Sequence, residues 1–256
     1  MRPMRIVIKI GTSTLAYKTG RLNINLMESL CKTISDLKNA GHEIILVSSG
    51  AIGMGVGKLS LAERPKDMPT KQAAAAVGQC ELMYRYDRLF SEYNHTVAQI
   101  LITGEDVENE ERHRRFRDTV FRLLELGALP VINENDTVST AEIAVGDNDT
   151  LSAIVATSVN ADLLILLSDI DGLYSADPRK DKNATLIPTV DKLTDEIMTL
   201  AGGAGSSLGT GGMATKLRAA KICTGRGIPM VIANGSRPER LYDVVAGKSV
   251  GTRFNA

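Results

Sequence analysis

The chain has 256 residues, of which 43% are hydrophobic and 23% are charged, and its 30 basic and 30 acidic side chains balance to a formal net charge of zero. This composition predicts a globular protein with a large core, and the balanced charge argues against nucleic-acid or membrane binding driven by bulk charge. The three scattered cysteines, the lack of a signal-type run and the lack of an apolar stretch long enough to span a bilayer together predict a cytoplasmic protein with free thiols.

Short apolar runs alternate with helical patterns along the chain. In the first half we predict strands at 6–10, 44–47, 96–102 and 129–132 and helices at 26–37, 70–90 and 114–126. Residues 136–145 are predicted to form an excursion such as a hairpin. In the second half we predict helices at 149–159, 192–200 and 213–225, strands at 163–167 and 228–232, and a short helix and strand at the end. Strands that are apolar throughout and separated by helices indicate an α/β fold, with a mainly parallel central sheet sandwiched by helices.

Polar and glycine-rich segments stand at the ends of predicted strands, where ligands bind in open α/β sheets, and two further ones, at 146–149 and 209–216, lead into predicted helices. They are Lys9-Ile-Gly-Thr-Ser13, Ser48-Ser-Gly-Ala-Ile-Gly-Met-Gly55, Asn133-Glu-Asn-Asp136, Gly146-Asp-Asn-Asp149, Ser168-Asp169 and Gly209-Thr-Gly-Gly-Met-Ala-Thr-Lys216. Two predicted glycine-rich turns, at 50–55 and 209–212, suit a ligand with several phosphates. Neither fits the P-loop or the dinucleotide-binding spacing, so neither of those folds is supported.

Two lysines stand where a phosphate-binding cation would be useful. Lys9 lies in an apolar strand, where its burial is costly unless it meets an anion. A position at the edge of the strand, with the ammonium group reaching water, explains Lys9 equally well. Lys216 follows the second glycine-rich turn near a helix start, and its alternative interpretation is a surface helix lysine.

Acidic residues gather near the same strand ends. Asp147 and Asp149 open a predicted helix and have a simple interpretation as caps. Together with Glu134 and Asp136, however, they indicate a cationic partner, which is a substrate amine, Mg²⁺ or the two lysines. The basic cluster at 112–115 lies among glutamates and aspartates, which is typical of a solvated, salt-bridged helix face.

Taken together and in this order, the motifs resemble the amino acid kinase family. The resemblance runs from residue 5 to residue 254. It implies a single α/β/α kinase domain over 1–256, with an amino-acid-binding lobe at roughly 1–160 and a nucleotide-binding lobe at roughly 161–256. Within the family the chain is most similar to members that phosphorylate the γ-carboxylate of free glutamate, the first step of proline biosynthesis. N-acetylglutamate kinases and aspartokinases carry a Gly-Gly type of sequence where this chain has Gly11-Thr-Ser13.

The resemblance implies a role for each matching residue. Lys9 and Lys216 would handle the phosphates, Asp149 would hold both lysines in place, and all three would be catalytic. Ser49, Asp136 and Asn148 would bind glutamate. The contacts to ATP would come from Lys9, Gly11, Gly50, Ser168, Asp169, Thr210, Gly211, Gly212, Met213, Ala214, Thr215 and Lys216, and Gly53 would add a backbone N–H group.

The resemblance also implies partners. ATP and Mg²⁺ are the expected cofactors, without a protein cage dedicated to the metal. Proline is a possible feedback inhibitor, and a homo-oligomer, either a dimer or a tetramer, is expected. Many members carry an additional C-terminal PUA domain of RNA-binding type, and we expect this protein to be a form without it. Two alternatives stay open: another member of the family acting on a different carboxylate or carbamate, and a non-catalytic amino-acid sensor on the same fold.

Overall fold

The computed structural model describes residues 2–17, 21–139, 145–200 and 212–256. In this part of the chain one eight-stranded sheet has the order β3-β4-β2-β1-β5-β7-β8-β6. The strands are β1 (Arg5–Ile10), β2 (Glu43–Ser48), β3 (Val97–Ile102), β4 (Leu129–Glu134), β5 (Leu163–Ser168), β6 (Thr189–Val190), β7 (Met230–Asn234) and β8 (Thr252–Phe254). Neighbouring strands are parallel except for β7 and β8, which are antiparallel.

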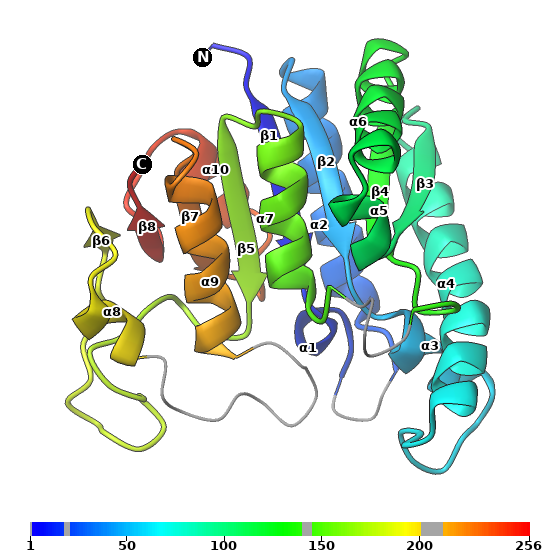
Figure 1. Cartoon of the computed structure of the whole chain (residues 1–256), viewed down its shortest axis with the longest axis horizontal. Helices are drawn as coiled ribbons and strands as arrows, with labels where there is room; N and C mark the ends of the chain where they lie inside the picture. Colours follow the sequence, from blue (N-terminus) through cyan, green and yellow to red (C-terminus); the bar gives the residue numbers. More distant parts are fainter. Residues whose placement is uncertain (1, 18–20, 140–144, 201–211) are drawn as a thin grey trace.

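Helices cover both faces of the sheet (Figure 1). They are α1 (Thr12–Leu15), α2 (Ile24–Asn39), α3 (Ala51–Lys58), α4 (Met68–Ser91), α5 (Gly104–Glu108), α6 (Glu110–Glu125), α7 (Asn148–Ser158), α8 (Asp195–Thr199), α9 (Met213–Thr224) and α10 (Arg240–Val245). One core joins the sheet to α2, α4 and α10, and a second core joins the opposite face to α6, α7 and α9. The predicted α/β/α arrangement is therefore confirmed.

Strand β1 illustrates how the two cores fix the direction of the Lys9 side chain. Successive side chains of a strand point to opposite faces. Ile8 therefore packs into the core with α2, and Val7 packs into the core with α7 and α9. Lys9 follows the same alternation and shares the face of Val7, so its side chain points toward α7 and α9 at the carboxyl end of the strand.

The glycine-rich turn predicted at 50–55 is wrong, because residues 51–58 form helix α3. Gly50 caps this helix with a left-handed backbone (φ 112°), a conformation that favours glycine. Gly55 in α3 and Gly78 in α4 allow the two helices to touch backbone to backbone. A Cβ atom on Gly55 would lie 1.8 Å from the carbonyl oxygen of Ala74, and one on Gly78 would lie 1.7 Å from that of Ala51. Close helix packing, rather than a turn, is the role of Gly55.

Replacing Gly78 with alanine is expected to destabilise the protein. The new methyl group has to push α3 away from α4, since the atom it meets belongs to the backbone of α3. Overpacking of this kind costs about 1–3 kcal/mol in the free energy of unfolding, and more where backbone must move. Denaturant unfolding measures the cost. Gly57→Ala, a glycine-to-alanine change at an exposed position of α3, is the control and should not destabilise.

Other differences from the sequence-based expectations concern short elements and helix ends. The helix expected at 114–126 begins earlier, at Glu110, because Asn109 accepts hydrogen bonds from the first-turn N–H groups. The helix expected at 192–200 is shortened to α8, and α1, α5 and β6 were not expected. Most of the excursion predicted at 136–145 lies outside the described residues. None of the described helices is both long and apolar enough to cross a membrane.

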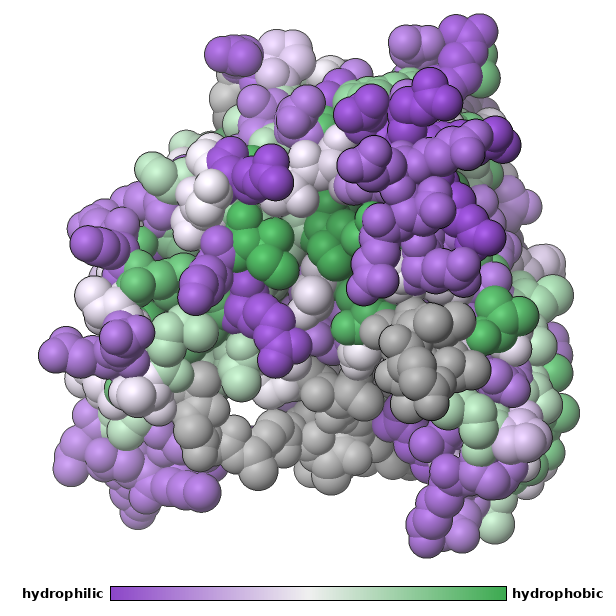
Figure 2. All heavy atoms as spheres, in the orientation of Figure 1, coloured by the Kyte–Doolittle hydropathy of each residue, from purple (hydrophilic) through white to green (hydrophobic). Residues whose placement is uncertain are grey.

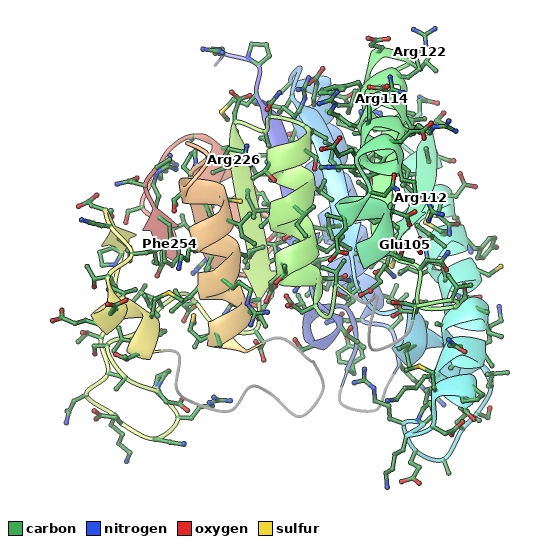
Figure 3. All side chains as sticks on the ribbon, viewed as in Figure 1. Glu105, Arg112, Arg114, Arg122, Arg226 and Phe254 are labelled. Atoms are coloured by element: carbon green, nitrogen blue, oxygen red, sulfur yellow. The ribbon has the colours of Figure 1, made fainter. Side chains whose placement is uncertain are left out.

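The basic cluster at 112–115 forms a salt-bridged helix face, as predicted. Arg112 lies beside the preceding short helix (Figure 3), with Nη1 3.5 Å from Glu105 and 3.3 Å from Asp106. Arg115 pairs with Glu111 one turn away at 2.5 Å. Hydrophilic residues dominate the surface over α6, in the upper right of Figure 2.

Candidate active site

A buried cluster of two lysines and one aspartate lies at the carboxyl end of β1. Lys9 Nζ is 2.6 Å from Asp149 Oδ1, and Lys216 Nζ is 3.0 Å from Asp149 Oδ2. Thr215 also donates a hydrogen bond from its hydroxyl group to Asp149 Oδ2, over 2.7 Å. Only 7% of Lys9, 1% of Asp149 and 6% of Lys216 are exposed. The interpretations of Lys9 as an edge lysine and of Lys216 as a surface lysine are therefore wrong.

Two helix starts bring this cluster together. Helix α7 is capped by Asp147, whose carboxylate accepts a hydrogen bond from the N–H group of Thr150 at 2.7 Å, and Asp149 lies in its first turn. Helix α9 begins after Gly212, and Lys216 lies at the end of its first turn. The two helices lie next to each other over the same face of the sheet (Figure 1). Both therefore direct the partial positive charge of a helix N-terminus toward the end of β1.

The electrostatics of the cluster favour anions. Burial alone would raise the pKa of the Asp149 carboxyl, but the ammonium groups of Lys9 and Lys216 outweigh burial and lower this pKa to about 2. Asp149 is therefore ionised at neutral pH. Because two ammonium groups share one carboxylate, the cluster keeps a net positive charge. It is poorly solvated, so its electrostatic interaction with an anion is stronger than it would be in water.

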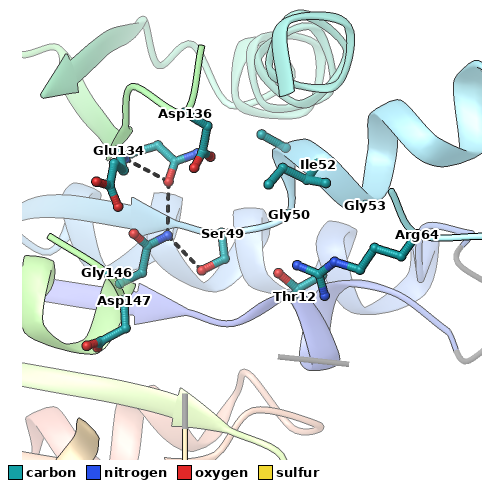
Figure 4. A pocket seen from close by; sticks show the side chains of 13 residues that line it. Thr12, Ser49, Gly50, Ile52, Gly53, Arg64, Glu134, Asp136, Gly146 and Asp147 are labelled. Carbon is teal, nitrogen blue, oxygen red and sulfur yellow. Dashed lines mark hydrogen bonds between the residues drawn. The ribbon is translucent and has the colours of Figure 1, made fainter. Parts of the chain in front are cut away.

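A small pocket opens beside the cluster, with a volume of about 140 Å³. Figure 4 shows side chains from several elements converging on it. Its lining consists of Thr12, Ser49, Gly50, Ala51, Ile52, Gly53, Arg64, Asn133, Glu134, Asp136, Gly146, Asp147 and Asn148. The ends of β1, β2 and β4 and the starts of α3 and α7 thus meet here, as expected for the carboxyl edge of a parallel sheet.

Amide and hydroxyl groups form a network on one wall of the pocket. The side-chain NH₂ group of Asn148 donates to Ser49 Oγ at 2.7 Å and to Asn133 Oδ1 at 2.9 Å (Figure 4). Asn133 in turn donates to Gln79 Oε1 at 3.0 Å, which ties the network to α4. Ser49 and Asn148, both predicted to bind the same ligand, are therefore in direct contact. Asn133 was not among the predicted site residues, although the motif that contains it was noticed.

Two carboxylates, Glu134 and Asp136, make the pocket acidic beside this network (Figure 4). Burial and the neighbouring charge of Glu134 raise the pKa of Asp136 to about 6, while the charge of Arg64 opposes this shift. Glu134 accepts hydrogen bonds at Oε1 from Ser139 Oγ at 3.0 Å and from the N–H group of Val145 at 2.8 Å. This part of the pocket suits a ligand that carries a positive charge. Among the described residues, no group of three or more His, Cys, Asp or Glu side chains is placed to hold a metal ion.

The sequence profile of the amino acid kinase family matches residues 4–234. The chain belongs to the amino acid kinase family. A glutamate 5-kinase from Clostridium tetani (strain Massachusetts / E88) is 58% identical over 251 residues, which are 98% of this chain and 94% of that protein. A glutamate 5-kinase from Clostridium perfringens (strain 13 / Type A) is 53% identical over 98% of this chain and 95% of its own length. A third glutamate 5-kinase, from Caldanaerobacter subterraneus, is 52% identical over 98% of this chain and 68% of its own length.

Solved structures of other kinases share the fold at low sequence identity. Carbamate kinase from Giardia lamblia bound to AMP-PNP superposes with a TM-score of 0.71 at 16% identity, over 99% of both chains. Isopentenyl phosphate kinase from T. acidophilum gives a TM-score of 0.68 at 18% identity, over 98% of this chain and 100% of that one. Their similarity establishes the architecture and nothing further about the substrate.

Some of the residues that are expected to contact ATP lie within the described part of the chain. Ser168 ends β5 beside β1 and donates to Asp169 Oδ1 at 3.2 Å. Gly212 to Lys216 form the cap and first turn of α9, and Thr210 and Gly211 lie outside the described residues. None of Ser168, Asp169 and Gly212–Lys216 lines the pocket, whereas Gly50 and Gly53 do. The roles of these residues toward ATP stay predictions.

Proposed function

We propose that this member of the amino acid kinase family transfers the γ-phosphoryl group of ATP to the γ-carboxylate of L-glutamate. The products are ADP and L-glutamyl 5-phosphate, and the reaction is the first step of proline biosynthesis. The observation that carries the proposal is the buried Lys9–Asp149–Lys216 cluster beside a small pocket with acidic and amide walls. Relatives that are more than half identical over nearly the whole chain bear the name glutamate 5-kinase.

Phosphoryl transfer to a carboxylate needs little general acid–base catalysis. A γ-carboxylate has a reference pKa of about 4.3, so it is already ionised and nucleophilic at neutral pH. One of its oxygens attacks the γ-phosphorus of ATP, and the bond from that phosphorus to the bridging oxygen breaks, so that ADP leaves with the electron pair. The obstacle is the approach of an anion to a polyanion. Phosphoryl transfer overcomes such an obstacle mainly by positioning and by charge stabilisation.

The side chains of the cluster meet this requirement. Lys9 and Lys216 supply positive charge to the transferring group, and Asp149 fixes the positions of both Nζ atoms before substrates bind. Mg²⁺ would enter with ATP as part of the nucleotide substrate and neutralise further phosphate charge. Asp149 acts here as a positioning residue, because both of its oxygens are occupied by the lysines and by Thr215.

The pocket beside the cluster fits a free amino acid. Asp136 supplies an anionic partner for the substrate ammonium group, and the network of Ser49, Asn133 and Asn148 supplies neutral hydrogen-bonding groups. A kinase for an N-acetylated substrate has no ammonium group to hold, so an acidic wall would be of no use to it. Free glutamate is therefore favoured over N-acetylglutamate.

The affinity for glutamate is expected to weaken as the pH falls below about 6. Burial and Glu134 raise the pKa of Asp136 to about 6, so below that pH the carboxyl is protonated and loses its attraction for the ammonium group. The KM for glutamate, measured between pH 5 and pH 8, should rise toward the acidic end while the KM for ATP changes less. Asp136→Asn should give a high KM for glutamate without this rise. A KM for glutamate that stays level from pH 8 to pH 5 would contradict the role of Asp136.

The proposed reaction is tested by trapping its acyl phosphate with hydroxylamine. Glutamate, N-acetylglutamate and aspartate are compared with Mg²⁺ and ATP under the same conditions. Hydroxamate from glutamate alone supports the proposal. Hydroxamate from another acid moves the enzyme to a different substrate, and ATP binding without any turnover favours an amino-acid sensor. The division into two lobes, the cytoplasmic location, inhibition by proline and the homo-oligomeric state stay predictions.

A further inference from the structure

Gln79 is a polar residue on the buried face of helix α4. The other residues of that face include Ala75, Leu82 and Tyr86, and only 7% of Gln79 is exposed. A buried amide group is costly unless both of its ends are hydrogen-bonded. This cost is not fully offset at Gln79, because its Nε2 atom has no hydrogen-bond partner among the described residues. The packing of α4 therefore does not explain why a glutamine occupies this position.

The oxygen of the Gln79 amide contacts the candidate active site. Gln79 Oε1 accepts a hydrogen bond from Nδ2 of the buried Asn133 at 3.0 Å. The orientation of Asn133 is fixed from its other end, where the backbone N–H group of Glu134 donates to Asn133 Oδ1 at 2.9 Å. A backbone N–H group can only donate, so the NH₂ group of Asn133 must face Gln79. Gln79 thus holds the Asn133 side chain from the side of α4.

The orientation of Asn133 determines which atom of Asn148 remains for a ligand. Asn148 Nδ2 donates to Asn133 Oδ1 at 2.9 Å and to Ser49 Oγ at 2.7 Å, as the dashed lines in Figure 4 show. An amide NH₂ group has two hydrogens, so both are taken. Asn148 lines the pocket, and among the described contacts its Oδ1 atom takes part in no hydrogen bond. This atom is an acceptor, and an ammonium group, which can only donate, is a suitable partner for it.

We propose that Gln79 is a positioning residue for recognition of the substrate ammonium group. Gln79 holds Asn133, and Asn133 in turn orients Asn148. Asn148 then presents its carbonyl oxygen to the ammonium group, in the same pocket as the Asp136 carboxylate. Gln79 is not among the described residues that line the pocket, so it acts through the two asparagines. The proposal rests on the proposed function, since it concerns the binding of the same substrate.

The test compares two acids that differ only in the ammonium group, namely glutamate and glutarate. Gln79→Met keeps the approximate length of the side chain but leaves the buried NH₂ group of Asn133 without its acceptor. Loss of such a partner typically changes an equilibrium by about 10-fold, so the KM for glutamate should rise by about that factor. The kcat and the KM for ATP should change little. Binding of glutarate, measured as competitive inhibition of glutamate turnover, should also change little.

Two further variants separate positioning from a packing defect. Gln79→Glu keeps an oxygen at the place of Oε1 and loses only the nitrogen that has no partner. It should therefore bind glutamate nearly as well as the wild type. Arg88→Met, at an exposed position of the same helix, is the matched control and should change the binding of neither acid. Thermal unfolding of each variant verifies that the fold is intact.

Each other outcome overturns the proposal in a recognisable way. Equal weakening of glutamate and glutarate in Gln79→Met would mean that Gln79 supports the shape of the pocket and not recognition of the ammonium group. Unchanged kinetics in Gln79→Met would mean that Asn133 needs no support from α4. Weak binding of glutamate by Gln79→Glu would show that the acceptor atom is not decisive, even if Gln79→Met does not fold. A wild-type protein that forms no acyl phosphate from glutamate would instead refute the proposed function, and the role of Gln79 would fall with it.

Discussion

Replacement of Lys216 with alanine is expected to slow acyl-phosphate formation by about 1,000-fold, with Lys9→Ala having an effect of similar size. Loss of one preorganised donor from a transition state typically costs 100- to 1,000-fold in rate, and here a full charge is lost as well. The loss should appear in kcat rather than only in KM, because the lysine stabilises the negative charge of the phosphoryl group more strongly in the transition state than in the bound substrate. The hydroxamate assay measures the rate directly.

The structure also explains why these lysine variants should fold. When one lysine is removed, Asp149 keeps an ion pair with the other, so no buried carboxylate is left without a countercharge. Lys221→Ala, at an exposed position of the same helix α9, is the matched control and should retain full activity. Turnover near the wild-type rate in either Lys9→Ala or Lys216→Ala would disprove the catalytic assignment.

Replacement of Asp149 with alanine is expected to remove activity and also to destabilise the protein. The substitution leaves two buried ammonium groups close together without their shared countercharge. Breaking a buried ion pair by removing one partner costs about 3–5 kcal/mol in the free energy of unfolding. Denaturant unfolding measures this cost, and Asp118→Asn, on an exposed face of α6, is the control with little expected effect.

A second substitution separates the electrostatic explanation from a simple packing defect. Adding Lys9→Met to Asp149→Ala removes one of the stranded charges, so the double variant should be more stable than Asp149→Ala alone. A double variant that is less stable would indicate that packing, rather than charge, explains the loss. In the wild type, the pKa of Asp149 is lowered from 3.8 to about 2. Its stabilising contribution is therefore complete above pH 3.8 and disappears as the pH falls through about 2.

The sequence by itself determined the fold class and the main elements. The apolar runs at β1, β2, β4 and β5 are buried on both faces, and such strands are recognisable from local composition. The motifs of the site were also recognisable because each stands at the end of a strand or at the start of a helix, and parallel strands bring their carboxyl ends to one edge. The resemblance to the amino acid kinase family then named Lys9, Asp149 and Lys216 together before their contacts were known, and their catalytic role stays a prediction.

Only the tertiary structure decided between the alternatives that local patterns left open. Lys9 has the same neighbours in the sequence whether it reaches water or Asp149, and the packing of α7 over β1 settles the matter. The segment at 51–58 is helical, and Gly55 lets it pack directly against α4, a contact that no local pattern reveals. Asn133 and Arg64 became visible as parts of the site in the same way. Such features depend on contacts between residues far apart in the chain, whereas sequence patterns record mainly the preferences of near neighbours.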